Sequence, residues 1–173
     1  MPETEEEADA MQMKRIEKND PVAMLRMGGT RHDEGDYSSA FEYYTKAAEL
    51  GDASAHYNLS VMYHLGQGVE KDEKKQVYHL EKAAISGHVD ARHNLGCHEG
   101  DNGRMERAVK HFTIAANMGH EGSMKALWKC YARGLVKKDD LNATLRAHHA
   151  AVDATKSPQR EEAASTSFTP PPP

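Results

Sequence analysis

The sequence lacks the cysteine patterns that form disulfide frameworks or structural zinc sites. Cys97 and Cys130 are its only cysteines among 173 residues, and neither belongs to a CxxC or CxxH pair of the zinc-finger type. Two isolated thiols give neither a disulfide framework nor a zinc cluster. We therefore expect a chain without a metal or other cofactor, in a reducing compartment such as the cytoplasm or the nucleus.

Long apolar runs and an excess of positive charge are also missing. No stretch approaches the ~20 apolar residues that a membrane-spanning helix requires. Residues 1–13 are acidic and lack the apolar core of a signal peptide. The formal net charge is −5 at pH 7, whereas binding to nucleic acid phosphates normally needs a basic patch. We expect neither a membrane nor a nucleic acid as the partner.

What the sequence does contain is a repeated signature of two alanines followed by a glycine. It occurs as Lys46-Ala47-Ala48 with Gly51, Lys82-Ala83-Ala84 with Gly87, and Ile114-Ala115-Ala116 with Gly119. Residues 20–51 align without a gap on residues 88–119, with nine identical pairs. Residues 52–87 fit the same frame with four extra residues, Gly66-Gln67-Gly68-Val69. Such a period is typical of a repeat array, whose units bury their apolar faces against one another.

Each unit divides at a central glycine into two segments of helical period. In the second unit the first half carries Ala55, Leu59 and Tyr63 at positions i, i+4 and i+8. The glycine that closes each unit suits the left-handed residue that ends a helix. Small residues at Gly28, Ser60 and Gly96 mark the points where two antiparallel helices would cross closely. The sequence therefore predicts an all-α fold of helix–turn–helix repeats stacked into an α-solenoid.

This frame divides the chain into six segments. They are an acidic N-terminal helix at 1–19, repeats at 20–51, 52–87 and 88–119, a degenerate fourth repeat at 120–155, and a disordered Ser/Thr/Pro tail at 156–173. We expect helix over residues 5–18, with Thr4 and Glu7 as a capping box. The fourth repeat lacks the double alanine and carries Trp128 in the small-residue column, which is typical of a C-terminal cap. Its second helix is expected over residues 140–154.

The second unit resembles the Sel1-like repeat family, relatives of the tetratricopeptide repeats. The matching residues are Ala55, Leu59, Met62-Tyr63, the Gly66-Gln67-Gly68-Val69 loop, Asp72 and Lys82-Ala83-Ala84 before Gly87. The Gly-x-Gly-Val loop followed by an aspartate is specific to this family among helical repeats. The resemblance covers about residues 20–153. It implies a right-handed α-solenoid that acts as a non-catalytic scaffold or adaptor and binds other proteins.

In related solenoids the first helices of the hairpins line a concave face that holds peptides. The resemblance places on this face Val22, Leu25, His32, Tyr57, Val61, His64, Asp90, His93, Cys97, Lys125, Lys129 and Arg133. Lys125, Lys129 and Arg133 are spaced i, i+4 and i+8 and so share one side of a helix. Three cations there could clamp a carboxylate of an acidic peptide or a chain terminus. The alternative is an ordinary solvated basic face.

Other chemistries have weaker support in the sequence. His93 and Cys97 lie at i, i+4, but a tetrahedral zinc site needs four ligands. His148-His149, Asp139-Asp140 and Cys130 carry acid–base or nucleophilic groups with nothing to fix their geometry. We therefore predict no catalytic residue and no metal ligand. The alternatives to a peptide-binding scaffold are an RNA-binding helical repeat and an enzyme of the cysteine-poor Sel1 type.

Overall fold

The computed structural model describes residues 5–166, and these residues form nine α-helices and no strand. The helices are α1 Glu5–Glu17, α2 Pro21–Asp33, α3 Tyr37–Glu49, α4 Ala53–Leu65, α5 Glu73–Ile85, α6 Val89–Asp101, α7 Met105–Asn117, α8 Glu121–Ala132 and α9 Lys138–Thr166. The all-α class predicted from the repeat is confirmed. Thr4 of the expected capping box lies outside the described residues.

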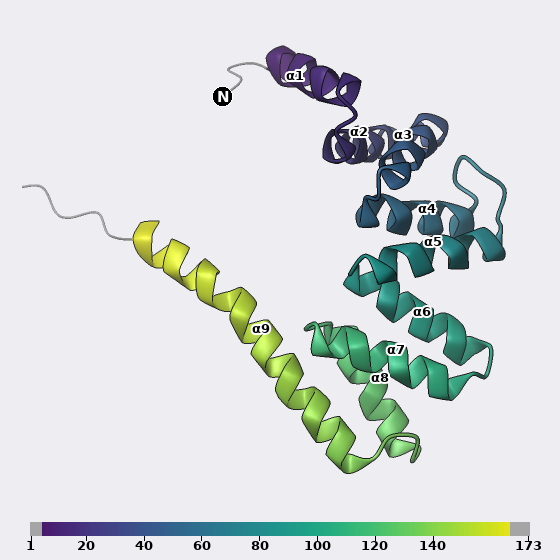
Figure 1. The fold of residues 1–173 in the computed structure, drawn as a ribbon, viewed down its shortest axis with the longest axis vertical. Helices are drawn as coiled ribbons and strands as arrows, with labels where there is room; N and C mark the ends of the chain where they lie inside the picture. Colours follow the sequence, from purple (N-terminus) through teal and green to yellow (C-terminus); the bar gives the residue numbers. More distant parts are fainter. Residues whose placement is uncertain (1–4, 167–173) are drawn as a thin grey trace, which may run out of the picture. The chain divides into compact units, whose positions relative to one another are not determined.

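The chain divides into two compact units, Met1–Arg92 and His93–Pro173, and the division falls within α6. In the first unit α2 packs on α3, and α4 packs on α5 as an antiparallel hairpin joined by residues 66–72 (Figure 1). In the second unit α7 packs on both α8 and α9. Among residues 5–166, none of the helices combines the length and the hydropathy that a membrane span requires.

The small-residue column lets aromatic rings of the second helices approach the first helices. A Cβ atom on Gly28 would lie 2.6 Å from the ring of Tyr44, and one on Gly96 would lie 2.6 Å from the ring of Phe112. Both rings belong to buried residues of the two hydrophobic cores. The absence of a side chain at the two glycines is therefore a packing requirement, because a methyl group would occupy the place of a ring.

The long loop of the second hairpin depends on Gly68. This residue has φ of 70°, in the left-handed region, and a Cβ atom on it would lie 2.5 Å from the carbonyl oxygen of Tyr37. The loop thus lies directly against the start of α3 in the preceding hairpin. Both the backbone conformation and the lack of space favour glycine here.

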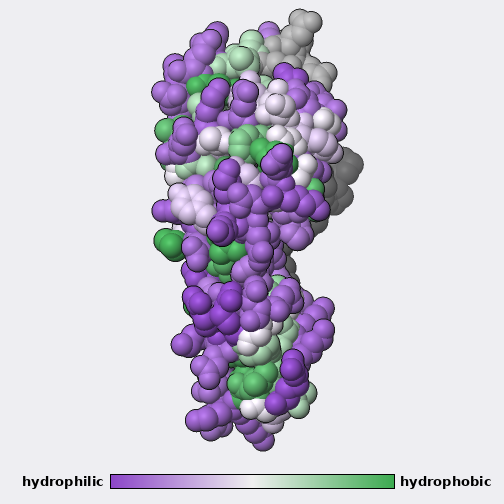
Figure 2. All heavy atoms as spheres, turned by 90° about the vertical axis from the view of Figure 1, so that its right-hand side faces the viewer, coloured by the Kyte–Doolittle hydropathy of each residue, from purple (hydrophilic) through white to green (hydrophobic). Residues whose placement is uncertain are grey.

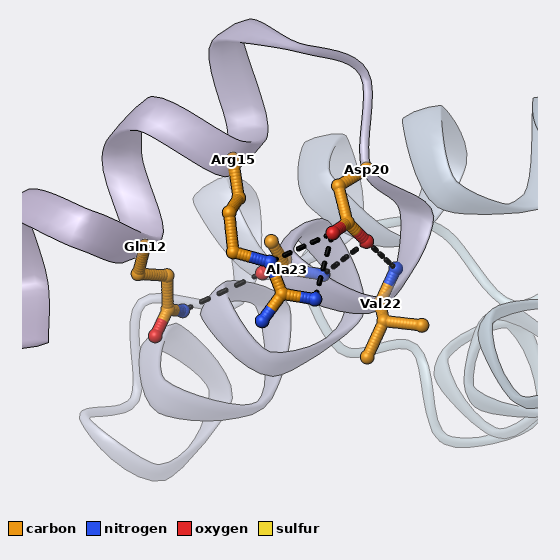
Figure 3. Close-up of polar contacts among 5 residues, drawn as sticks. All are labelled: Gln12, Arg15, Asp20, Val22 and Ala23. Atoms are coloured by element: carbon orange, nitrogen blue, oxygen red, sulfur yellow. Dashed lines mark hydrogen bonds and ion pairs between the residues drawn. The ribbon is translucent and has the colours of Figure 1, made fainter. Parts of the chain in front are cut away.

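The helix α1 is tied to α2 at the turn between them. Asp20 caps α2 by accepting hydrogen bonds from the backbone N–H groups of Val22 at 3.0 Å and Ala23 at 3.2 Å (Figure 3). The Arg15 guanidinium of α1 donates to the same carboxylate at 2.7 Å. The Gln12 amide donates to the Ala23 carbonyl oxygen at 3.4 Å. The hydrogen bond from Arg15 is the main cause of a lowered pKa for Asp20.

The last hairpin differs from the others in both of its helices. Trp128 stands in the small-residue column and leaves 46% of its surface exposed. The helix α9 continues through Pro158 to Thr166 and extends far beyond α8 (Figure 1). The helix thus ends at Thr166, whereas the sequence predicts a helix end at 154 and a disordered tail from 156.

Candidate functional site

Three of the predicted binding residues lie on α4 in the first unit. The Tyr57 ring stacks on the His88 ring with centroids 4.4 Å apart and an interplanar angle of 13°. Val61 is half-buried, while His64 is exposed and its Nδ1 lies 3.3 Å from the Gln76 side-chain oxygen. The Tyr57 ring is therefore held by a neighbouring residue and offers only part of its surface to a ligand.

The helix α6 contributes Asp90, His93 and Cys97. Asp90 is exposed in the first unit. In the second unit His93 lies between Cys97 and α8: its Nε2 is 3.6 Å from Cys97 Sγ and its Nδ1 is 2.9 Å from Ser123 Oγ. The His120 ring lies 4.4 Å from the His93 ring. The structure thus places His93 and Cys97 in a polar network that joins α6 to α8.

This network contains the types of side chain found in nucleophilic sites, but their environments disfavour a nucleophilic reaction. Burial raises the pKa of the Cys97 thiol, and Asp101 raises it further, so the reactive thiolate is disfavoured. The Ser123 side chain is completely buried, at 0% exposure, and no substrate reaches it. Among the described residues, no three His, Cys, Asp or Glu side chains are grouped to hold a metal ion. The arrangement therefore stabilises helix packing.

His148 and Cys130, which were also considered for catalysis, are both buried. His148 is buried, its Nδ1 lies 3.0 Å from the Ala116 carbonyl oxygen and its Nε2 lies 3.3 Å from Glu121. Burial raises the pKa of Cys130.

Two of the tyrosines are too deeply buried to bind RNA by stacking. Tyr44 and Tyr63 are buried, which removes both as stacking platforms for nucleic acid bases.

The predicted basic row is present on α8 and at its end. Lys125, Lys129 and Arg133 are all exposed. Lys125 Nζ lies 3.6 Å from the exposed carboxylate of Glu121, a pair that water screens strongly. Within the part of the chain that the structure describes, Lys129 and Arg133 form no ion pair. Three cations thus follow one helix, and Lys125 is paired with the Glu121 carboxylate.

The same helix carries an exposed aromatic pair that was not predicted from the sequence to lie on the surface. The Trp128 and Tyr131 rings meet edge to face with centroids 6.2 Å apart, and both residues are exposed. Leu135, after the end of α8, is exposed as well. The sequence did indicate that Trp128 cannot take part in a close helix crossing, because tryptophan stands there in a position that is glycine in other repeats. That the ring is exposed could be seen only in the structure.

A groove of about 520 Å³ runs between α7 and α9 in the second unit. Its lining is mainly apolar, with Val109, Leu127, Leu135, Val136 and Leu141 among the contributors. Lys137 and Asp140 also line it. This is not the convergent set of acids, bases or nucleophiles that a catalytic pocket presents.

The comparisons with known proteins come from sequence and from structure. The family model for the Sel1 repeat matches residues 21–52, 53–88 and 89–120, more than half of the chain. A Sel1 repeat protein from Oxalobacter formigenes is 34% identical, with a TM-score of 0.67 over 83% of this chain and 62% of that one. A protective antigen of uropathogenic Escherichia coli with an SLR fold is 28% identical, with a TM-score of 0.68 over 84% of this chain and 33% of the other.

A mouse protein, DAP3-binding cell death enhancer 1, is 26% identical over 167 residues. The match takes in 73% of this chain and 33% of the mouse protein. The chain therefore spans about a third of the length of this relative.

Proposed function

This chain belongs to the Sel1 repeat family, and on that basis we propose that it is a non-catalytic module that binds segments of other proteins. The proposed ligands are extended peptides that lie along the first helices of its hairpins. The mouse relative is named for binding another protein, which supports a protein as the class of ligand. Cys97 and Cys130 are free thiols, in keeping with the proposed location in the cytoplasm or nucleus.

The observation that carries this proposal is the basic row of α8. Lys125, Lys129 and Arg133 present three exposed cations in one line, suited to charge-assisted hydrogen bonds with carboxylates. Trp128 and Tyr131 add exposed aromatic surface on the same helix. Tryptophan, tyrosine and arginine are the residues that most often dominate binding energy at protein interfaces. An acidic peptide with an aromatic or aliphatic residue fits this combination.

The face that Figure 2 shows supports polar rather than broadly hydrophobic recognition. On the face that Figure 2 shows, hydrophilic residues dominate and hydrophobic ones appear in small separate areas. A ligand that depends on a large apolar contact would have little to bind on that face. On that face, charge complementarity has to supply much of the selectivity.

The proposal is tested with a fluorescein-labelled peptide of alternating glutamate and phenylalanine, followed by fluorescence anisotropy. We expect Lys125→Glu/Lys129→Glu to weaken binding by about tenfold or more, because two attractive contacts become repulsive. The matched control is Lys74→Glu/Lys110→Glu, which changes the net charge equally on exposed lysines of α5 and α7. Equal binding by the wild type and both variants would exclude the α8 row as the binding surface.

Proximity labelling in cells extends the test to natural partners. The same three proteins are compared, and partners lost from the α8 variant but retained by the control identify ligands of the row. A partner set that is identical for all three proteins contradicts the proposal.

A further inference from the structure

The outward face of α8 brings one aromatic ring together with two cations. Lys125, Trp128 and Lys129 stand at positions i, i+3 and i+4, which are neighbours on the surface of a helix. All three residues are exposed, and Trp128 leaves 46% of its surface accessible. At 3.6 residues per turn, Trp128 and Lys129 lie on opposite sides of Lys125 around the helix. The three side chains therefore form one compact surface, the Lys–Trp–Lys face.

The Trp128 ring is held by a neighbour on its own helix. Tyr131, three residues later, meets it edge to face with ring centroids 6.2 Å apart. Ala132, four residues after Trp128, is exposed and small, so a ligand backbone can come close to the helix at that point. The indole is thus fixed in position while part of its surface stays open to a ligand.

A carboxylate limits the Lys–Trp–Lys face at its start. Glu121 stands four residues before Lys125, and its carboxylate lies 3.6 Å from Lys125 Nζ. Both groups are exposed, so water screens the pair and a ligand carboxylate can share the ammonium group. A ligand carboxylate placed before Lys125 would instead meet the like charge of Glu121. The favourable positions for ligand acids are therefore Lys125, Lys129 and Arg133.

The spacing of these cations matches an extended chain. Side chains on one edge of an extended peptide repeat at every second residue, about 6.6–6.8 Å apart. At about 1.5 Å per residue, four residues of a helix separate consecutive members of the row by about 6 Å. The residue between two such acids points to the opposite side of the peptide. On α8 that side is occupied by Trp128, which starts about 4.5 Å after Lys125 along the axis.

We propose that the Lys–Trp–Lys face selects extended segments of partner proteins in which one apolar residue stands between two acidic ones. The acidic side chains bind Lys125 and Lys129, and the apolar side chain between them packs on the Trp128 ring. A third acid two residues later binds Arg133. This inference rests on the proposed function and adds to it the order of the ligand's residues. The same residues in another order bring the same charge but no apolar group to Trp128.

The test compares two labelled pentapeptides of identical composition, Glu-Phe-Glu-Ser-Glu and Phe-Ser-Glu-Glu-Glu, by fluorescence anisotropy with the full chain. We expect the first to bind about three- to tenfold more tightly, because only its phenyl ring reaches Trp128 while two acids bind the lysines. Trp128→Ala should reduce this ratio to less than about twofold, with both peptides still bound. The matched control is Tyr78→Ala, which removes an exposed aromatic residue of α5 and should leave the ratio unchanged.

The emission of Trp128 reports on the contact directly, because it is the only tryptophan of the chain. Unlabelled Glu-Phe-Glu-Ser-Glu should shift the emission maximum to shorter wavelength, since the phenyl ring displaces water from the indole. Phe-Ser-Glu-Glu-Glu at saturation should produce a smaller shift. Equal emission maxima with the two peptides would overturn the assignment of Trp128 as the apolar contact.

The outcomes separate this inference from the proposed function. Equal affinities for the two peptides, with binding still lost in Lys125→Glu/Lys129→Glu, would overturn the ordered ligand and leave the proposed function standing. Absence of binding by either peptide would contradict both. A helix-forming peptide with acids at i and i+4 and phenylalanine at i+3 is the last comparison. Tighter binding by this peptide would overturn the extended conformation, since five residues are too few for a stable isolated helix.

Discussion

At the scale of single residues, the contact between His56 and His79 sets an unusual condition on protonation. Their Nδ1 atoms lie 3.0 Å apart, across the α4–α5 hairpin, and the His79 ring stacks on Tyr63 with centroids 5.6 Å apart. A hydrogen bond between these two nitrogens needs one donor and one acceptor, so only one of the two Nδ1 atoms can carry a proton. Burial, together with the charge that His56 and Lys75 would place nearby, lowers the pKa of His79 to about 4.

This environment predicts that the His79 imidazole stays neutral in mild acid. Its ring proton shifts in NMR should be flat from about pH 8 to about pH 5 and move only near the lowered pKa. Because the folded pKa lies below the ordinary one, the unfolded chain binds the proton first, and His79 lowers stability as the pH falls from 6.5 towards 4. The same titration in concentrated urea is the control, since the unfolded chain should restore the ordinary pKa. A folded-state midpoint near 6.5 would contradict the described contact.

At the scale of elements, the crossing of α2 and α3 makes two adjacent glycines behave differently. A methyl group on Gly28 would meet the Tyr44 ring at 2.6 Å, whereas one on Gly29 would meet only the Tyr44 hydroxyl oxygen at 3.9 Å. We expect Gly28→Ala to destabilise the chain by about 1–3 kcal/mol through overpacking. Gly29→Ala should stabilise it by up to about 1 kcal/mol, because alanine has the higher helix propensity.

Urea denaturation followed by far-UV circular dichroism measures both changes. The two variants add the same atoms at neighbouring positions, so differences in composition cancel. The prediction fails if both substitutions shift the free energy of unfolding in the same direction.

The helix crossings could be predicted from the sequence, whereas one of the contacts between helices could not. The small residues at Gly28 and Gly96 predicted close helix crossings, and the structure confirms them through the Tyr44 and Phe112 rings. Spacing sufficed because the helical period and the double alanines are local patterns. The Ser123 hydroxyl shared with His93 was missed, because this contact joins residues 30 positions apart and depends on side-chain rotamers.

The positions of the binding residues could be predicted from the sequence, but their environments could not. The row of Lys125, Lys129 and Arg133 follows from i, i+4 spacing alone and is exposed in the structure. The stacking of Tyr57 on His88 could not be anticipated, since nothing local indicates a ring 31 residues away. The assignment of these residues to partner binding stays a prediction.

At the scale of the whole molecule, the stability of a repeat chain is a sum of local terms. Contacts in such proteins join neighbouring repeats, so a change in one hairpin acts mainly on that hairpin and on those beside it. Here the contacts group into Met1–Arg92 and His93–Pro173. Protection against hydrogen exchange should therefore respond region by region rather than uniformly.

Gly28 and Gly96 provide a reciprocal test, because they hold the same place in different repeats. A methyl group at either would lie 2.6 Å from an aromatic ring, Tyr44 for Gly28 and Phe112 for Gly96. Gly28→Ala should lower exchange protection mostly in peptides from α2–α5, and Gly96→Ala mostly in peptides from α7 and α8, by mass spectrometry of the full chain. The two variants control for each other, since the added group and the type of clash are alike. Equal loss of protection along the chain in both variants would mean that the molecule unfolds as one cooperative body, and the local account of its stability would have to be abandoned.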